Sequence, residues 1–175
     1  MQYVMFNKRQ LSEQRGKISK WNVLAFAGLF LLGVATAIYM QQGRIKSVEL
    51  PTLSGGQVTL PGEGLSWVNF WSISCPPCLK EMPYLEAIHR DGIEGVQIVA
   101  VNLNYDPPVD VNDYIKRENF TLPVALDLNN AALQQFTDKP VVPSHYLVDA
   151  SGKILLTHLG EIDEAGIRKA IAEHL

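Results

Sequence analysis

A run of 23 residues without a charged side chain, from Trp21 to Gly43, constrains this chain more than any other feature. A helix of roughly 20 apolar residues crosses the hydrocarbon core of a membrane, whereas the apolar region of a signal peptide has about 7–15 residues. Residues 1–20 carry five basic side chains and one acidic side chain, which by the positive-inside rule places them in the cytoplasm. The sequence therefore predicts a cytoplasmic segment at 1–20, a transmembrane anchor at 21–43 and a domain at 44–175 beyond the membrane.

Other interpretations of this segment stay open. Ala35-Thr36-Ala37 fits the small-x-small pattern of a signal-peptide cleavage site, which would remove the segment after export. A buried helix of a soluble protein is a weaker alternative, because the flanking basic residues favour a membrane. No cysteine lies near the end of the segment, which disfavours a lipid anchor. We expect a single-pass protein of the cytoplasmic (inner) membrane, with its C-terminal domain in the periplasm or another extracytoplasmic space.

The composition excludes several classes of protein. The chain has 15 basic and 18 acidic residues and is 47% hydrophobic, which fits neither a disordered chain nor a basic nucleic-acid binder. Residues 44–175 contain ten basic and seventeen acidic side chains, a balance that argues against nucleic acid and mildly favours a basic client surface. Two cysteines exclude a scaffold of several disulfides, and a zinc site would need two of the four histidines. No cofactor and no metal is predicted.

The first half of the exported domain is predicted to be a hairpin followed by a strand–helix–strand unit. Short strands at 48–50 and 57–60 flank the turn-forming Ser54-Gly55-Gly56. Residues 65–72 are mostly apolar and rich in aromatic side chains, as expected for a strand buried on both faces. Apolar residues then recur at helical spacing: Cys78, Met82, Leu85 and Ile88.

That helix is predicted to run to about Arg90, with a kink at Pro83 because proline lacks an amide donor and crowds the preceding turn. Residues 96–103 form the next buried strand. A connection of this length implies a right-handed crossover between parallel strands.

The second half is predicted to contain a helix–strand insertion followed by a β-β-α unit. Asp149-Ala150-Ser151-Gly152 is a turn between two strands that should pair antiparallel. The expected elements are a short helix around 111–115, a strand at 122–126, a helix at 131–136, strands at 145–148 and 153–159, and a helix at 163–174. The whole domain is therefore expected to be an α/β fold with a central mixed sheet.

The chemistry is predicted to lie at Cys75-Pro76-Pro77-Cys78, where a buried strand becomes a helix. Unpaired amides and the helix dipole favour a thiolate at a helix start, so Cys75 should be the more reactive thiol and Cys78 the more buried. Pro76 suits the first helical turn. We expect Cys75 to form a mixed disulfide that Cys78 resolves. A purely stabilising disulfide is a weaker alternative, because closing so short a loop removes little entropy from the unfolded chain.

Several segments resemble one known family. The segment from Trp71 to Pro83, with Val68-Asn69-Phe70 before it, looks like the active-site segment of the TlpA/ResA-like membrane-anchored thiol-disulfide oxidoreductases of the thioredoxin superfamily. Val142-Pro143-Ser144, followed by the strand at 145–149 and the Ser151-Gly152-Lys153 turn, is similar to the family's cis-proline loop and terminal hairpin. The resemblance covers about residues 47–172 and implies a thioredoxin-like fold with an N-terminal hairpin and a central insertion.

The resemblance also implies roles for single residues. Pro143 would be cis, and Val142 would expose backbone groups beside Cys75, where a client peptide could pair as an extra strand. An ordinary trans proline at the start of a strand is the alternative.

Glu81 follows Cys78 by three residues and so faces the same side of the helix. The resemblance implies that Glu81 moves protons to and from the cysteine pair, because thioredoxin carries a buried Asp where this chain has Asn69 and an amide cannot take a proton. A solvated acid in the first helical turn is the alternative interpretation of Glu81.

The chain also departs from the family pattern. Ser74 stands where the family often has Trp, so the apolar surface around Cys75 is expected to be reduced or supplied by Trp71 and Pro76. Trp71 is therefore expected to be half core and half active-site wall. Ser144 replaces the more usual Thr and keeps the hydroxyl.

The leading functional hypothesis is an exported thiol-disulfide oxidoreductase that reduces client disulfides. The resemblance implies electrons from an integral-membrane thiol transporter and clients such as apocytochrome c in cytochrome maturation. A disulfide-forming oxidant would use the same atoms, because the direction depends on the relative stability of the thiolate and disulfide forms.

Three further classes are weighed against it. A copper or zinc module could use Cys75, Cys78 and His145, although this is a partial ligand set. A c-type haem site would need His in place of Leu79. A peroxidase would need an activating Arg near Cys75, and an interaction module would leave both cysteines idle.

Overall fold

The computed structural model describes residues 20–41 and 43–175, and the side chains of residues 21–37 and 43–175. The predicted cytoplasmic segment, residues 1–20, lies outside the described residues except for the backbone of Lys20. The chain divides into two compact units, residues 1–42 and 43–175, and each is described by itself.

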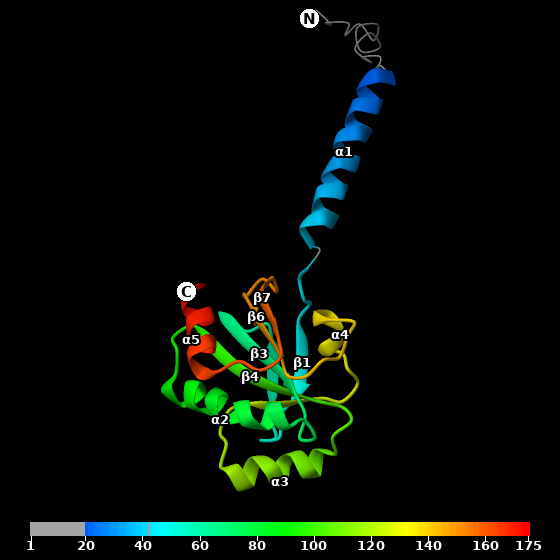
Figure 1. The fold of residues 1–175 in the computed structure, drawn as a ribbon. Helices are drawn as coiled ribbons and strands as arrows, with labels where there is room; N and C mark the ends of the chain where they lie inside the picture. Colours follow the sequence, from blue (N-terminus) through cyan, green and yellow to red (C-terminus); the bar gives the residue numbers. More distant parts are fainter. Residues whose placement is uncertain (1–19, 42) are drawn as a thin grey trace, which may run out of the picture. The chain divides into compact units, whose positions relative to one another are not determined.

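The first unit contains one helix, α1, from Lys20 to Gln41 (Figure 1). All its described side chains, those of residues 21–37, are exposed. Among the described residues, no helix is both long enough and apolar enough to span a membrane. The predicted anchor at 21–43 includes residues 38–42, whose side chains are not among those described. The anchor therefore stays a prediction.

The second unit begins with a two-stranded hairpin. Strand β1 (Val48–Pro51) pairs antiparallel with β2 (Gln57–Leu60). The turn between them contains Gly55 at a positive φ of 86°, a conformation that glycine adopts without steric cost. The predicted hairpin is confirmed.

A five-stranded mixed sheet follows, in the order β5-β4-β3-β6-β7. The central strand β3 (Leu65–Trp71) lies parallel to β4 (Val96–Leu103) and antiparallel to β6 (Ser144–Val148). Strand β5 (Val124–Asp127) extends the parallel side, and β7 (Ile154–Leu159) extends the antiparallel side. The predicted mixed sheet and the parallel crossover are confirmed.

Two apolar cores lie on opposite faces of this sheet because side chains alternate along β3. Trp67 and Trp71 join one core with three helices: α2 (Pro76–Asp91), α3 (Pro108–Glu118) and α5 (Glu164–Ala172). Val68 and Phe70 join the other core with the hairpin and α4 (Leu133–Phe136). Figure 1 shows α2 and α3 together, away from α4. Strand β3 is therefore buried on both faces, as predicted.

Several element boundaries differ from the sequence predictions by one to three residues, and the starts of β5 and α4 have a structural explanation. Strand β5 starts at Val124 rather than residue 122, because the amide of Leu122 donates to Glu86 and Pro123 has no amide hydrogen for a ladder. Helix α4 starts at Leu133 rather than residue 131. The carboxylate of Asp127 accepts the amides of Ala132 and Leu133 just before that helix.

Candidate active site

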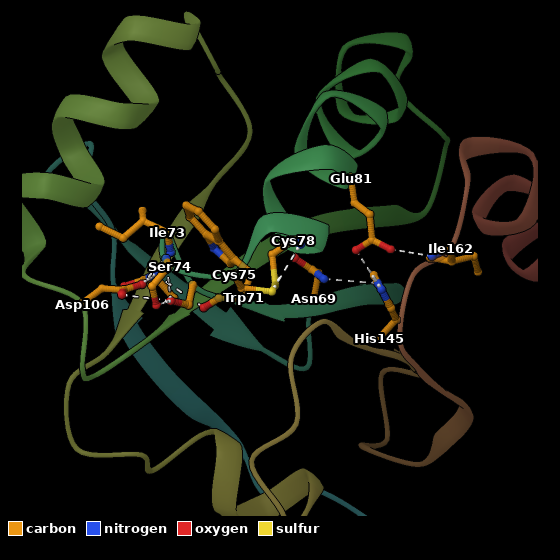
Figure 2. Close-up of a disulfide and its surroundings, with 12 residues drawn as sticks. Asn69, Trp71, Ile73, Ser74, Cys75, Cys78, Glu81, Asp106, His145 and Ile162 are labelled. Atoms are coloured by element: carbon orange, nitrogen blue, oxygen red, sulfur yellow. Dashed lines mark hydrogen bonds and ion pairs between the residues drawn. A yellow bond between two sulfur atoms is a disulfide. The ribbon is translucent and has the colours of Figure 1, made fainter.

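The two cysteines form a disulfide at the start of α2, with their Cα atoms 5.2 Å apart (Figure 2). Cys75 is the N-cap residue, and its sulfur accepts a hydrogen bond from the amide of Cys78 at 3.3 Å. Cys78 is buried at 1% exposure, whereas Cys75 is half-buried. Pro76 occupies the first helical position, as predicted. The geometry thus presents Cys75 and shields Cys78.

A buried carboxylate holds the loop that leads into Cys75. Asp106 accepts the hydroxyl of Ser72 at 2.9 Å and the amide of Ile73 at 2.8 Å. It also accepts the side-chain amide of Asn102 at 2.7 Å. The sequence pattern did not single out Asp106, although this residue follows a buried parallel strand at the edge where such strands end together. Asp106 therefore fixes the path of the chain between β3 and the disulfide.

Tyr105, beside this carboxylate, is partly exposed. Burial of its hydroxyl raises the pKa of Tyr105, a hydrogen bond with Ser72 opposes that effect, and the charge of Asp106 raises the pKa further.

The Val142–Pro143 peptide bond is cis, as the family resemblance implied. Pro143 is buried and Val142 is half-buried. Ser144, the next residue, pairs with Phe70 near the end of β3, so the proline loop lies at the end of the sheet from which the chain continues to Cys75. A second cis bond, Leu60–Pro61, was not predicted.

Trp71 differs from the expectation drawn for it. Its side chain has 0% exposure and lies 5.8 Å from the ring of Tyr114, measured between ring centroids. Trp71 is therefore wholly core and offers no outer surface, because it points from a strand that is covered on both faces. Pro76 and Ser74 are exposed next to Cys75.

Glu81 is buried at 1% exposure, which rules out the interpretation of a solvated first-turn acid. Its Oε1 atom accepts the amide of Ile162. Its Oε2 atom lies 3.3 Å from Nε2 of His145, a contact that falls outside hydrogen-bond geometry. Glu81 and Cys78 both belong to the buried face of α2, three residues apart.

His145 is completely buried, and the sequence analysis missed its neighbours. Its Nδ1 atom lies 3.2 Å from the side-chain amide nitrogen of Asn69, and the two residues face each other across β3 and β6. The sequence analysis considered His145 only as a partial metal ligand. Both ring nitrogens instead face Asn69 and Glu81, and the described residues contain no group of three or more His, Cys, Asp or Glu side chains placed for a metal ion.

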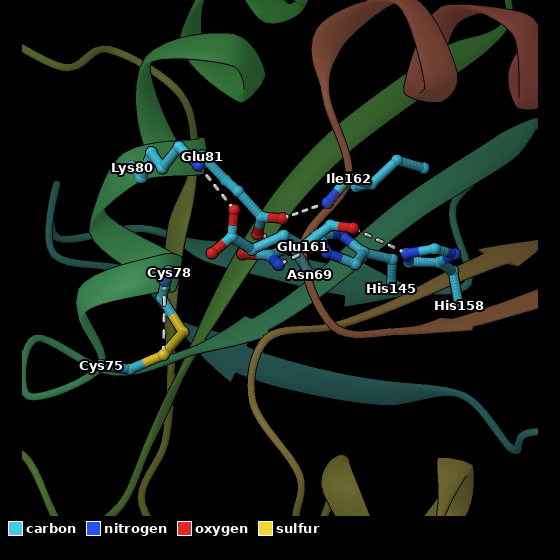
Figure 3. A network of polar contacts seen from close by, with 9 residues as sticks. All are labelled: Asn69, Cys75, Cys78, Lys80, Glu81, His145, His158, Glu161 and Ile162. Atoms are coloured by element: carbon cyan, nitrogen blue, oxygen red, sulfur yellow. Dashed lines mark hydrogen bonds and ion pairs between the residues drawn. A yellow bond between two sulfur atoms is a disulfide. The ribbon is translucent and has the colours of Figure 1, made fainter.

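A surface cleft of about 380 Å³ opens above Glu81, lined by Lys80, Glu81, Tyr84, Glu161, Ile162 and Asp163. Lys80 and Glu161 form an exposed ion pair of 2.7 Å over it (Figure 3). The hydrogen bond to Glu161 and its negative charge raise the pKa of Lys80. The buried carboxyl of Glu81 thus lies just behind a polar opening.

Comparisons with known proteins agree with this geometry. The sequence profile of the Redoxin family matches residues 40–173. Thiol-disulfide oxidoreductase ResA of Halalkalibacterium halodurans is 32% identical over 120 residues, which cover 68% of this chain and 62% of that protein. ResA of Bacillus subtilis is 32% identical over 123 residues, or 70% of this chain and 63% of that protein.

A solved structure gives the same result. The crystal structure of StoA from Bacillus subtilis superimposes with a TM-score of 0.66 at 25% identity, covering 71% of this chain and 95% of that one. The chain spans less than two thirds of the length of the ResA proteins it matches. Because the family profile covers most of the chain, including both cysteines, this chain belongs to the Redoxin family and is similar within it to the thiol-disulfide oxidoreductases ResA and StoA.

Proposed function

We propose that this chain is a thiol-disulfide oxidoreductase that exchanges disulfides with client proteins through Cys75 and Cys78. The observation that carries the proposal is the disulfide at the start of α2, where one sulfur is half-buried and the other is fully buried. The similarity to ResA and StoA supports the same chemistry.

In the reducing direction, the Cys75 thiolate attacks one sulfur of a client disulfide, and the other client sulfur leaves as a thiolate. The thiol proton of Cys78 passes to the carboxylate of Glu81. The Cys78 thiolate then attacks the sulfur of Cys75, the protein disulfide forms, and the second client sulfur leaves. The client gains two electrons, and the cysteine pair loses two.

Cys75 is the attacking residue for two reasons. It lies at a helix N-terminus, where the dipole and an amide hydrogen bond from Cys78 stabilise a thiolate. Cys75 is also the more exposed of the two residues, because it is half-buried whereas Cys78 has 1% exposure.

The client is proposed to bind along the loop of Val142 and Pro143, with backbone pairing as an added strand. Pro76 and Ser74 contribute the exposed surface next to Cys75. The family often has a tryptophan at the position of Ser74, and Trp71 is buried and does not replace it. This docking surface is therefore less apolar than the family pattern would make it.

The wider setting is also part of the proposal. Residues 21–43 anchor the chain in the cytoplasmic membrane, and the basic residues before them place the active domain on the outer side. A membrane thiol-disulfide donor then re-reduces the Cys75–Cys78 disulfide, and apocytochrome c is one client class that the family resemblance supports.

The direction of exchange is tested by the reduction potential of the full chain, equilibrated against thiol buffers and followed by thiol alkylation. A midpoint below roughly −220 mV supports the reductant, and one above roughly −150 mV would assign the chain to disulfide formation instead.

The exchange itself is tested by trapping. Cys78→Ser keeps the attacking thiol and removes the resolving one, so it should accumulate mixed disulfides with client proteins on a nonreducing gel. Cys75→Ser is the matched control and should trap none. Equal trapping by both variants would contradict the assigned roles.

A further inference from the structure

Three polar side chains from three elements meet in the core beside the dithiol. Asn69 comes from β3, Glu81 from α2 and His145 from β6, and the exposure of each is 1% or less. Figure 2 shows contacts from the ring of His145 to both Asn69 and Glu81. A buried polar group needs a partner, so the role of this histidine calls for an explanation.

The hydrogen bond from Asn69 selects one form of the imidazole. The side-chain amide nitrogen of Asn69 lies 3.2 Å from Nδ1 of His145. An amide nitrogen only donates, so Nδ1 accepts and carries no hydrogen. The neutral ring then carries its hydrogen on Nε2, the atom that faces Oε2 of Glu81 at 3.3 Å.

The two oxygens of Glu81 differ in their surroundings: one accepts a hydrogen bond, and the other lies in a contact that falls outside hydrogen-bond geometry. The amide of Ile162 donates to Oε1, and Nε2 of His145 faces Oε2. These two contacts hold the carboxyl in one orientation on the buried face of α2, which also carries Cys78. An ionised carboxylate is the form that can accept a proton from Cys78.

We propose that His145 is a positioning residue that, held by Asn69, orients the carboxyl of Glu81 to accept the proton of Cys78 in the resolving step. The inference rests on the proposed thiol-disulfide exchange and deepens it. His145 acts through Glu81 and touches neither sulfur.

Other groups lie near the contact between His145 and Glu81, but none of them takes the position of His145 beside Glu81. The ring of His158 on β7 lies 5.8 Å from that of His145, and its Nε2 atom lies 3.0 Å from the carbonyl of Glu161. The indole ring of Trp67 lies 5.7 Å from the ring of His145. On the outer side of Glu81, four titratable groups line the cleft: Lys80, Tyr84, Glu161 and Asp163.

Three variants separate proton positioning from simple packing. His145→Leu fills the space but removes the Nε2 atom that faces Glu81. His145→Gln keeps an amide donor that can reach the same oxygen. His158→Gln changes the neighbouring ring without touching Glu81, and serves as the matched control.

The assay follows the reduced full chain as it reacts with 5,5′-dithiobis(2-nitrobenzoate), between pH 5 and pH 9. Attack by Cys75 releases the first thionitrobenzoate and leaves a mixed disulfide, and attack by Cys78 releases the second. The second phase isolates the resolving step. The first phase controls for the accessibility and reactivity of Cys75.

We expect His145→Leu to slow the second phase at pH 7 by about tenfold and to change the pH profile of that phase, with the first phase unchanged. His145→Gln should stay within about threefold of the unsubstituted chain, and His158→Gln should match it. An unchanged second phase in His145→Leu, or equal slowing in His145→Leu and His145→Gln, would overturn the inference.

A second measurement needs no variant and holds even if His145→Leu fails to fold. Nitrogen-15 NMR of the labelled chain should show His145 with hydrogen on Nε2 and none on Nδ1, and protonation of Nδ1 would overturn the inference. The proposed function has its own test: a Cys78→Ser chain that traps no mixed disulfide refutes the exchange itself, whatever the state of His145.

Discussion

Asp106 supports the active-site loop through three hydrogen bonds, although it lies 31 residues beyond Cys75 in the sequence. The donors are the hydroxyl of Ser72, the amide of Ile73 and the side chain of Asn102. A buried carboxylate with several donors is stable only while those donors stay in place. The position of Cys75 therefore depends on a residue from the end of a different strand.

Replacing this carboxylate tests that dependence. Asp106→Ala leaves three donors without their acceptor, and we expect it to lower the free energy of unfolding by about 2–4 kcal/mol. Urea denaturation of the oxidised chain measures the change. Asp113→Ala removes an exposed acid from α3 and should alter stability by about 0.5 kcal/mol or less. Equal losses in the two variants would contradict the anchoring role.

Helix α2 is tied to the segment before β5 by a second buried carboxylate, Glu86. It accepts the amides of Thr121 and Leu122, each at 2.8 Å, together with the hydroxyl of Thr121. Arg90 donates to it from the next helical turn at 2.6 Å. Burial alone would raise the pKa of Glu86, but the hydrogen bonds from Leu122, Thr121 and Arg90 together lower it below 4.5.

The lowered pKa gives a prediction for stability against pH. A carboxyl whose pKa is lower in the folded state stabilises the fold above its unfolded pKa, and that stabilisation is lost as the pH falls through its folded pKa. Glu86→Gln should therefore cost about 1–3 kcal/mol at pH 7, and the difference from the unsubstituted chain should shrink as the pH falls below 4.5.

Urea unfolding at pH 7, 5, 4 and 3 measures this difference. Glu94→Gln, an exposed acid after the same helix, is the control and should show no such pH dependence. A cost of Glu86→Gln that stays constant over this pH range would show that packing, and not the charge, accounts for the effect.

At the scale of elements, local patterns predicted most of the fold. The strand at 96–103 was predicted at its observed bounds because a continuous apolar run between turn residues needs no distant information. Strand β5 was predicted two residues early because its start depends on the side chain of Glu86, which lies 36 residues away from Leu122. Trp71 is likewise buried because other elements pack on both faces of β3. The sequence of that strand alone does not show this packing.

At the scale of the whole molecule, both apolar cores consist of residues from Ile45 onward. The backbone contacts of the second unit begin at Gly43, whose carbonyl accepts the amide of Ile154, and Ile45 donates to Gly152. The apolar burial that stabilises this unit therefore lies within residues 43–175.

One fragment, residues 43–175, is compared with the full chain to test this division and the proposed anchor. Residues 43–175 alone should unfold cooperatively, within about 2 °C of the full chain, because the cores are complete. In cell fractionation we expect the full chain in the membrane pellet and the fragment, exported by a cleavable signal, in the soluble fraction. A fragment whose unfolding temperature lies well below that of the full chain would contradict the first expectation. A full chain found outside the membrane fraction would contradict the second.

The sequence by itself determined the order of strands and helices, the cysteine pair at a strand–helix junction and the family resemblance, because each depends on residues close together in the chain. The tertiary structure decided which polar groups surround that pair. Asn69 and His145 are 76 residues apart and meet because β3 and β6 pair in one register. A shift of that register by one residue would turn His145 to the other face of the sheet, so strand pairing brings the histidine to Glu81.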